Sequence, residues 1–410
     1  MRRRPPADLH CPYCYESFGR LEIEFRCSGR TNWGRPQCKP EPDKVLSERA
    51  GREVTALPAF AAETLDTKAD CPRCRASTTT RICPACHRPL PAMFGEIPSR
   101  IIALVGAKES GKTVFMTVLV HDLMHRLGEQ LDVTISPADD NTGHEFASYH
   151  EALLYGSDQL LPPTAAAASD RTPLVWRLTV GDPDSPARRR GRGPVRGLSR
   201  GSPAWSALLS LFDPAGEDLL SQRSAEQNAR YLAAADAIVL LLDPLQMPAA
   251  CKLAAAGTRL PSPPRGVADT PVRVLQNITD LLLRHAQPGS DGRISKPLAV
   301  AFSKIDAFQA SLDLTSPLRQ APVPGPQLDE ADSVRVHTEV QWLLDQWDGS
   351  LIGRIVRQHY RTYRYFGISA LGETPTESNQ VSERGIRPYR VGDPLTWILS
   401  RLGVFPVRGR

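Results

Sequence analysis

The segment from Gly106 to Thr113, GAKESGKT, has a spacing of residue types that suits phosphate binding. It fits the pattern GxxxxGK[ST] and lies between an apolar run and a segment of helical period. Glycines let successive backbone N–H groups face phosphate oxygens, and the helix N-terminus adds its positive end. A chance turn is the alternative, which the flanking elements disfavour. Within this phosphate loop and the first helical turn, the expected nucleotide contacts are Gly106, Glu109, Ser110, Gly111, Lys112, Thr113 and Val114.

Three further residues are expected to complete a magnesium and γ-phosphate site with Lys112 and Thr113. Asp213 and Gly216 form DPAG after an apolar run, where Asp213 would hold magnesium through water and the Gly216 N–H would meet the γ-phosphate. An ordinary β-turn is the alternative reading of DPAG. A threonine before the second strand should close over the ion. The candidates are Thr142, Thr164 and Thr172; we favour Thr164, which has room to fold over the site.

The choice of base depends on two segments much later in the chain. Ser303-Lys304-Ile305-Asp306 follows an apolar run and is similar to the guanine-recognition pattern [NT]KxD. A carboxylate at Asp306 accepts hydrogen bonds from guanine N1–H and its amine, whereas adenine would leave that carboxylate unmatched, at a cost of about 1–3 kcal/mol. The alkyl stem of Lys304 would lie along the base. After the last strand, the loop Ser369-Ala370-Leu371 would offer a backbone N–H to guanine O6. The set favours GTP and GDP over ATP.

Two departures from the usual pattern predict slow turnover. Ser303 stands where Asn or Thr is usual and lacks the amide that braces the phosphate loop. Glu217 stands where many such enzymes place a water-orienting Gln, and its carboxylate could act as a base or repel the γ-phosphate. We expect a magnesium-dependent GTPase that hydrolyses GTP to GDP slowly and acts as a regulatory switch. A guanine-nucleotide adaptor without hydrolysis is the alternative.

Eight of the nine cysteines lie before residue 90, where their spacing indicates metal binding rather than disulfides. Pairing in sequence order would put four in a CxxC-x8-CxxC zinc site and the first four in another, while a crossed pairing stays open. His10 and His87 adjoin the ligands but are not needed, and Cys251 is expected to be a packed residue. The eight expected ligands of two zinc ions are Cys11, Cys14, Cys27, Cys38, Cys71, Cys74, Cys83 and Cys86.

Composition narrows the class of protein. The chain has 410 residues, 41% of them hydrophobic, so it can bury a core and hold two or three domains. Zinc-bound thiolates would offset most of the net charge of +5, so basicity does not argue for nucleic-acid binding. A loop at 181–204 holds six arginines; a flexible surface loop is the favoured interpretation, and a docking patch for an acidic partner or RNA is the alternative. An RNA-contacting GTPase is therefore a third reading of the function. Without an apolar span or signal segment, we expect a cytoplasmic protein.

The elements that must position these residues alternate between apolar runs and segments of helical period. This predicts an α/β fold, a three-layer sandwich with a mostly parallel sheet and one antiparallel edge hairpin, since no helix separates the second and third strands. We expect a zinc-binding module at residues 1–95 and a nucleotide-binding domain at 96–410. Inserts are expected near 139–170, 181–204, 246–270 and 308–334.

The order of these motifs resembles a known family. Paired CPxC modules feed into IALVGAKESGKT and then DPAGED, FSKID and ISALG, which is similar to the P-loop GTPases of the translation-factor-related class and, in its layout, to the bacterial double-GTPase family. That resemblance implies a role in multi-gene conflict or regulatory systems. Only one complete motif set is present, so a second GTPase or an activating protein would be a separate partner chain, docked or sensed through the zinc module.

Overall fold

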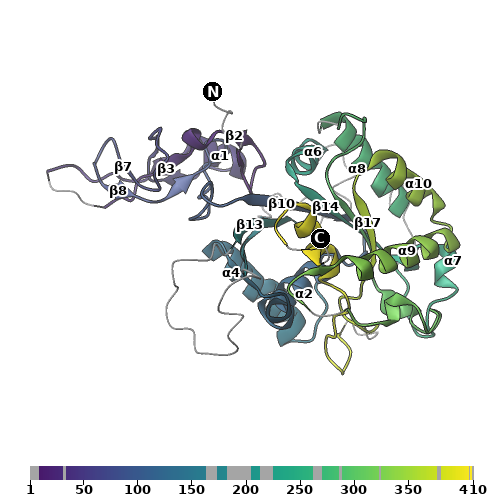
Figure 1. Ribbon diagram of the computed structural model, residues 1–410. Helices are drawn as coiled ribbons and strands as arrows, with labels where there is room; N and C mark the ends of the chain where they lie inside the picture. Colours follow the sequence, from purple (N-terminus) through teal and green to yellow (C-terminus); the bar gives the residue numbers. More distant parts are fainter. Residues whose placement is uncertain are drawn as a thin grey trace.

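The computed structural model describes residues 9–30, 34–162, 173–181, 205–212, 225–261, 270–285, 289–322, 325–375, 380–405 and 407–408. Two parts are evident in Figure 1: a central sheet covered by helices, and an elongated cysteine-rich segment on one side of it. Among the described residues, no helix combines the length and apolarity needed to cross a membrane.

The central sheet has seven strands in the order β11-β12-β13-β10-β14-β15-β17. Strands β13, β10, β14, β15 and β17 run parallel, whereas β12 pairs antiparallel with both β11 and β13. The predicted α/β class and the antiparallel hairpin are therefore confirmed, but β11 extends the sheet beyond the hairpin. The strands are β10 (Ser99–Gly106), β11 (Val133–Pro137), β12 (Leu174–Val180), β13 (Trp205–Phe212), β14 (Ala237–Leu242), β15 (Leu298–Phe302) and β17 (Tyr363–Gly367).

Helices cover both faces of this sheet (Figure 1). One layer and its core include residues of α6 (Ala225–Ala234), α8 (Pro271–His285), α9 (Glu330–Gln346) and α10 (Ser350–His359). The opposite layer includes α2 (Lys112–Met124), α3 (Arg126–Leu131), the π-helix η2 (Phe146–Gly156) and α11 (Asp393–Arg401). Shorter elements are α4 (Asp140–Glu145), α7 (Pro248–Cys251), η4 (Pro244–Gln246), η6 (Ile305–Phe308), η7 (Pro317–Arg319), β16 (Leu328–Asp329) and β18 (Val407–Arg408).

The period-2 alternation of strands explains why one sheet serves two cores. In β10, Ile101, Ala103 and Val105 face the core beneath α6 and α8. Their neighbours Ile102 and Leu104 face the core beneath α2. Both sides are apolar because both are covered, which is typical of a parallel sheet between helix layers. The helical pattern of residues 335–358 predicts one helix, but the structure has two, α9 and α10, separated at Gly349.

The cysteine-rich segment has little regular structure. Its largest sheet has three short strands in the order β6-β3-β9. Phe18, Ile23, Leu90 and Phe94 join Cys11, Cys83 and Cys86 in a small core that also takes in Val175 of β12 and Leu208 of β13. Its elements are β1 (Leu9–His10), β2 (Ser17–Phe18), η1 (Arg20–Glu22), β3 (Glu24–Arg26), β4 (Glu41–Pro42), α1 (Lys44–Ala50), β5 (Thr55–Ala56), β6 (Ala59–Ala61), β7 (Ala69–Asp70), β8 (Ser77–Thr78) and β9 (Arg81–Ile82).

Candidate functional site

The phosphate loop joins the end of β10 to the start of α2, as its sequence predicts. Gly106 has no room for a side chain, because a Cβ there would lie 2.6 Å from the Leu241 carbonyl oxygen and 2.6 Å from Ser110 Oγ. Gly111 caps α2 with φ of 87°, a left-handed conformation that glycine adopts without steric cost. The two glycines bring the backbone close to strand β14 and open the helix N-terminus toward the loop.

Lys112 lies inside this loop. Its Nζ donates to the carbonyl oxygens of Gly106 (3.1 Å) and Ala107 (3.0 Å), and the residue is 6% exposed. The Ser110 hydroxyl is fully buried in the same turn and has no hydrogen-bond partner among the described residues. A buried ammonium beside an unmatched hydroxyl is a polar environment suited to anionic oxygens. Thr113 and Val114 follow on the first turn of α2.

Lys304 connects the end of β15 to the phosphate loop. Its Nζ lies 2.6 Å from Asp243 Oδ2 and donates to the Glu109 carbonyl oxygen at 3.1 Å. Asp243 follows β14 and is fully buried, and its other oxygen accepts from the Leu245 N–H. Burial raises the pKa of Asp243, and the Lys304 ammonium opposes that rise.

Sequence reasoning missed Asp243, although a charged residue directly after the all-apolar run AIVLLL is a visible signal.

Asp306 and Ser369 come together from the ends of β15 and β17. The Ile305 N–H donates to the Ile368 carbonyl oxygen at 3.1 Å, which aligns the two loops. Burial raises the pKa of the Asp306 carboxyl, and a hydrogen bond with Ser369 opposes the shift. Ser369 Oγ accepts from the Gly372 N–H at 2.8 Å. The Ser303 hydroxyl instead donates to the Leu242 carbonyl oxygen of β14, so no contact of this hydroxyl with the phosphate loop is seen.

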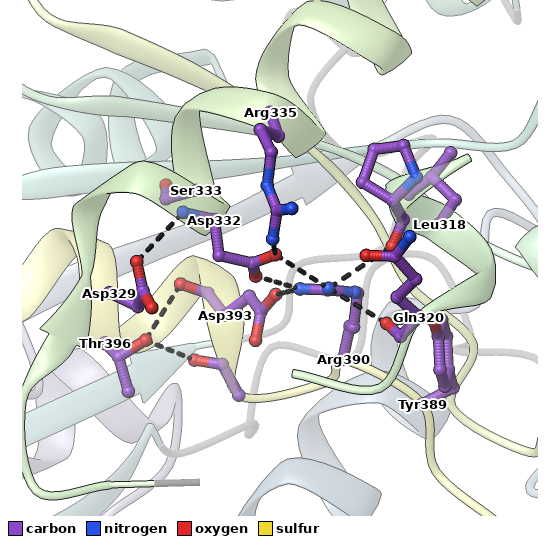
Figure 2. A network of polar contacts seen from close by, with 12 residues as sticks. Leu318, Gln320, Asp329, Asp332, Ser333, Arg335, Tyr389, Arg390, Asp393 and Thr396 are labelled. Atoms are coloured by element: carbon purple, nitrogen blue, oxygen red, sulfur yellow. Dashed lines mark hydrogen bonds and ion pairs between the residues drawn. The ribbon is translucent and has the colours of Figure 1, made fainter. Parts of the chain in front are cut away.

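The loop of Ser369, Ala370 and Leu371 is held from behind by a later segment of the chain. Ser369 and Tyr389 exchange both backbone hydrogen bonds, and the Arg387 N–H donates to the Leu371 carbonyl oxygen. The next residue, Arg390, is fully buried and contacts Asp332 and Asp393 at 2.8 Å each (Figure 2). Its Nη2 also donates to the carbonyl oxygens of Pro317 and Gln320. Its partner Asp393 is only three residues away, but the others come from two distant segments, at 317–320 and at Asp332, so the local sequence does not mark Arg390 as the centre of this network.

Several predicted site residues cannot be placed. Thr164, Asp213, Gly216 and Glu217, together with the alternative Thr172, lie outside the described residues, as does most of the arginine-rich loop at 181–204. Thr142 is fully buried in α4, where its hydroxyl accepts from the Val175 N–H, so it has a structural role there. The magnesium site expected from Thr113, Thr164 and Asp213 therefore stays a prediction.

The eight cysteines form two groups of four, but not in sequence order. One group joins Cys11 and Cys14 to Cys83 and Cys86, and the other joins Cys27 and Cys38 to Cys71 and Cys74. Pairing by sequence order is therefore wrong, and the crossed arrangement, with the second group nested inside the first, is the one formed. The physical reason is that β3 pairs with both β6 and β9, which brings the two ends of the segment together.

The geometry of both groups fits zinc. Sγ–Sγ separations between the CxxC turns include 3.8 and 3.9 Å in one group, and the other group has separations of 3.5 and 3.9 Å. Four thiolates arranged tetrahedrally about a zinc ion, at bonds of about 2.3 Å, would be about 3.8 Å apart. Burial raises the pKa of the Cys11 thiol, so a metal would be needed to hold it as a thiolate. With four sulfurs each, the sites are closed and suit a structural ion.

Each CxxC pair lies in the same kind of turn. The residues that follow the second cysteine, Tyr15, Arg75 and His87, all have positive φ, and each donates its N–H to the carbonyl oxygen of the first cysteine. This turn points both sulfurs at one centre. The His87 ring contacts Asp43 and Glu24 rather than a cysteine group. This agrees with the expectation that His87 is not needed as a zinc ligand.

The first of these turns also contacts the central sheet and its helices. The Tyr13 hydroxyl donates to Asp139 Oδ2, the N-cap of α4, at 2.6 Å. The Tyr15 ring packs against Tyr231 of α6 with ring centroids 5.1 Å apart, and Glu16 pairs with Arg230 of the same helix. The turn of Cys11 and Cys14 therefore touches α4 and α6, and α6 begins directly after the undescribed segment at 213–224.

Comparisons with known proteins give one close relative. The chain is 31% identical over 344 residues to the "Putative ESX-1 scaffolding and assembly protein SaeC" of Mycolicibacterium smegmatis (strain ATCC 700084 / mc(2)155), covering 79% of this chain and 80% of the relative. That relative is not described by its name as a double GTPase, so the double-GTPase resemblance stays a hypothesis. No protein-family model matches the chain.

Two of the solved structures that are similar to this chain are GTP-binding proteins by their descriptions. The Arl6 BBS3 small GTPase of Trypanosoma brucei, with a bound GppNp, is 11% identical and covers 74% of this chain and 98% of its own, with a TM-score of 0.29. The signal recognition particle receptor SRb-GTP/SRX complex of Chaetomium thermophilum is 13% identical and covers 68% and 93%, with a TM-score of 0.29.

Proposed function

The chain belongs to the family of the putative ESX-1 scaffolding and assembly protein SaeC. For this member of the family, we propose that it is a guanine-nucleotide-binding protein. The nucleotide would lie at the carboxyl ends of β10, β14, β15 and β17, the usual ligand position of an open α/β sheet. Lys112 and the N-terminus of α2 would hold the phosphates, and Asp306 would read the base. A magnesium ion would sit beside Thr113.

The observation that carries this proposal is the contact between the two predicted motifs. Lys304 of the base motif reaches the Glu109 carbonyl of the phosphate loop, although 195 residues separate them. Asp306, two residues later, lies beside Ser369 at the end of the neighbouring strand. A ligand with phosphates in the loop and a guanine ring against Asp306 would span both motifs. Guanine fits because it offers two donors to one carboxylate, which adenine cannot.

Hydrolysis is proposed to be slow and to be completed by a partner protein. Glu217 stands at the usual place of the water-orienting residue, and a carboxylate there is a poor substitute for an amide. Such a protein would act as a switch between GTP and GDP forms. The adaptor without hydrolysis remains the second candidate, favoured by the Ser303 hydroxyl, which bonds to Leu242 in place of bracing the phosphate loop.

The zinc-bearing segment is proposed to transmit or receive the signal of this switch. This segment touches α4 and α6 through Tyr13, Tyr15 and Glu16. A movement of either helix would therefore alter these contacts. The scaffolding and assembly role in the relative's name is consistent with a protein partner for this segment. A second GTPase or an activating protein on another chain, as the double-GTPase resemblance implies, would be such a partner.

A base-swap experiment tests the proposal. Fluorescent GTP, ATP and xanthosine triphosphate are titrated into the zinc-replete wild type, Asp306→Asn and Asp313→Asn. The Asn amide can donate to the C2 carbonyl of xanthine, so D306N should lose GTP and gain xanthosine triphosphate by at least about tenfold. Asp313, an exposed turn residue near the site, serves as the matched control. Equal binding of all three nucleotides by the wild type would refute guanine recognition.

Turnover is measured on the same proteins. Phosphate release from GTP under single-turnover conditions separates the switch from the adaptor, with Lys112→Ala as the inactive control. A fast rate in the isolated wild type would contradict the proposed need for a partner. Binding without any release above the K112A level would favour the adaptor.

A further inference from the structure

A third group of metal-ligating side chains lies away from both the cysteines and the phosphate loop. His121 of α2, His125 at the end of the same helix and Glu151 of η2 each offer one ligand atom, and these atoms lie within 4.8 Å of one another. The function proposed above uses none of them. We propose that these three residues bind one divalent transition-metal ion, of which zinc is the best match, between α2 and the π-helix η2.

The donor set supports this class of ion. Two imidazoles and one carboxylate are ligands that zinc accepts in open sites, where a fourth position is left to water or a partner group. Ligand atoms about 2.1 Å from one tetrahedral ion lie about 3.4 Å apart. His121 Nδ1 and Glu151 Oε1 are 2.7 Å apart, and the two imidazole centroids are 4.4 Å apart. Side-chain rotations are therefore enough to admit the ion.

The surroundings hold the ligands in place. The His121 ring stacks on Tyr155 at 3.6 Å with an angle of 16°, which fixes its plane. Asp122 is taken by Arg126 at 2.6 Å and so leaves the carboxylate role to Glu151. The two helices already touch one turn earlier, where the Thr117 hydroxyl meets His150 Nδ1 at 3.0 Å. His121 and Glu151 are partly exposed and His125 is exposed, so an ion can enter from solvent.

The ion would link α2 to η2. Helix α2 begins with Lys112 of the phosphate loop, and η2 ends six residues before the undescribed segment that contains Thr164. An ion held by both helices would fix η2 against α2. The metal site itself does not depend on the proposed nucleotide, so it can be tested without one.

Counting zinc tests the site directly. Full-length protein is dialysed to equilibrium against micromolar free zinc, and bound zinc is measured per chain for the wild type, His121→Ala, His125→Ala, Glu151→Gln and His144→Ala. His144 is an exposed histidine on the neighbouring helix α4 and is the matched control. We expect three ions in the wild type and H144A but two in H125A and H121A. E151Q should weaken binding of the third ion, because it replaces a charged carboxylate ligand with a neutral amide.

The measured zinc counts either support or overturn the third metal site. Three ions that fall to two in H125A establish the site, since loss of this exposed side chain leaves the packing of α2 intact. Two ions in the wild type under these conditions overturn it, and leave a His121–Glu151 ion pair as the role of the cluster. A third ion that persists in both H121A and H125A also overturns it. Should H121A retain fewer than two ions, it has lost its fold, and H125A and E151Q decide the result.

Discussion

Removing the Arg390 guanidinium should destabilise the protein more than any exposed charge could. Arg390 is fully buried, with Nη1 at 2.8 Å from both Asp332 and Asp393 (Figure 2). The carboxylates of Asp393 and Asp332 raise the pKa of Arg390 although burial alone would lower it, so the group stays charged. Arg390→Met leaves the Asp393 carboxylate without its cation and takes the buried cation from Asp332, which keeps only the exposed Arg335. Loss of one partner from a buried ion pair costs about 3–5 kcal/mol.

A matched control comes from the same network. Arg335 also contacts Asp332 at 2.9 Å, but its side chain is 58% exposed. Arg335→Met should therefore cost only about 0.2–1 kcal/mol. Adding Asp393→Asn to R390M removes the carboxylate that has lost its cation, and the double variant should recover about 1–3 kcal/mol of the R390M loss.

The assay is urea unfolding of zinc-replete protein, followed by tryptophan fluorescence at neutral and mildly acidic pH. Burial raises the pKa of Asp393 even with Arg390 present, and Arg390 opposes that rise. Without Arg390 the carboxyl takes up a proton more readily in the folded state than in the unfolded chain. The R390M deficit should therefore be largest at neutral pH and shrink as pH falls. An R390M loss no greater than that of R335M, or one that does not depend on pH, would refute the reasoning.

Other perturbations give separate readouts. Lys304→Met leaves Asp243 buried without its cation and should cost about 1–3 kcal/mol in urea unfolding while weakening GTP binding; unchanged values for both would contradict the bridge between the loops. Cys14→Ser should lower the zinc count from two to one in metal-limited protein and destabilise the central sheet. Cys38→Ser should also lose one zinc ion, but with little effect on the sheet. The difference is expected because only the group of Cys14 shares a core with β12 and β13. Burial, aided by Arg364, lowers the pKa of His337 to about 4. As pH falls, His337 in the unfolded chain is therefore protonated before His337 in the folded protein. The free energy of unfolding should fall by about 2–3 kcal/mol between pH of about 6.5 and pH 4. His337→Gln should reduce this dependence of stability on pH.

Much of the proposed site is local and can be predicted from sequence. The phosphate loop depends on the spacing from Gly106 to Thr113, because two glycines and a lysine within one turn dictate where N–H groups and the ammonium point. Burial between two helix layers likewise makes β14 a continuous apolar run, so the parallel sheet is visible in the sequence. Two elements were less visible. Strand β11 lies just before the expected insert at 139–170, in residues to which no element was assigned. The π-helix η2 lies inside that insert and does not follow the usual helical period.

The sequence by itself determined which residue types were available for phosphate, base and metal, and which short turns they occupy. Tertiary structure decided which of them meet. Cys14 and Cys83 share a site because β3 lies between β6 and β9, and Lys304 finds Asp243 because β14 and β15 are neighbours in the sheet. Arg390 contacts Asp332 across 58 residues in the same way. Contacts between distant residues depend on strand order and helix packing, which no local spacing encodes.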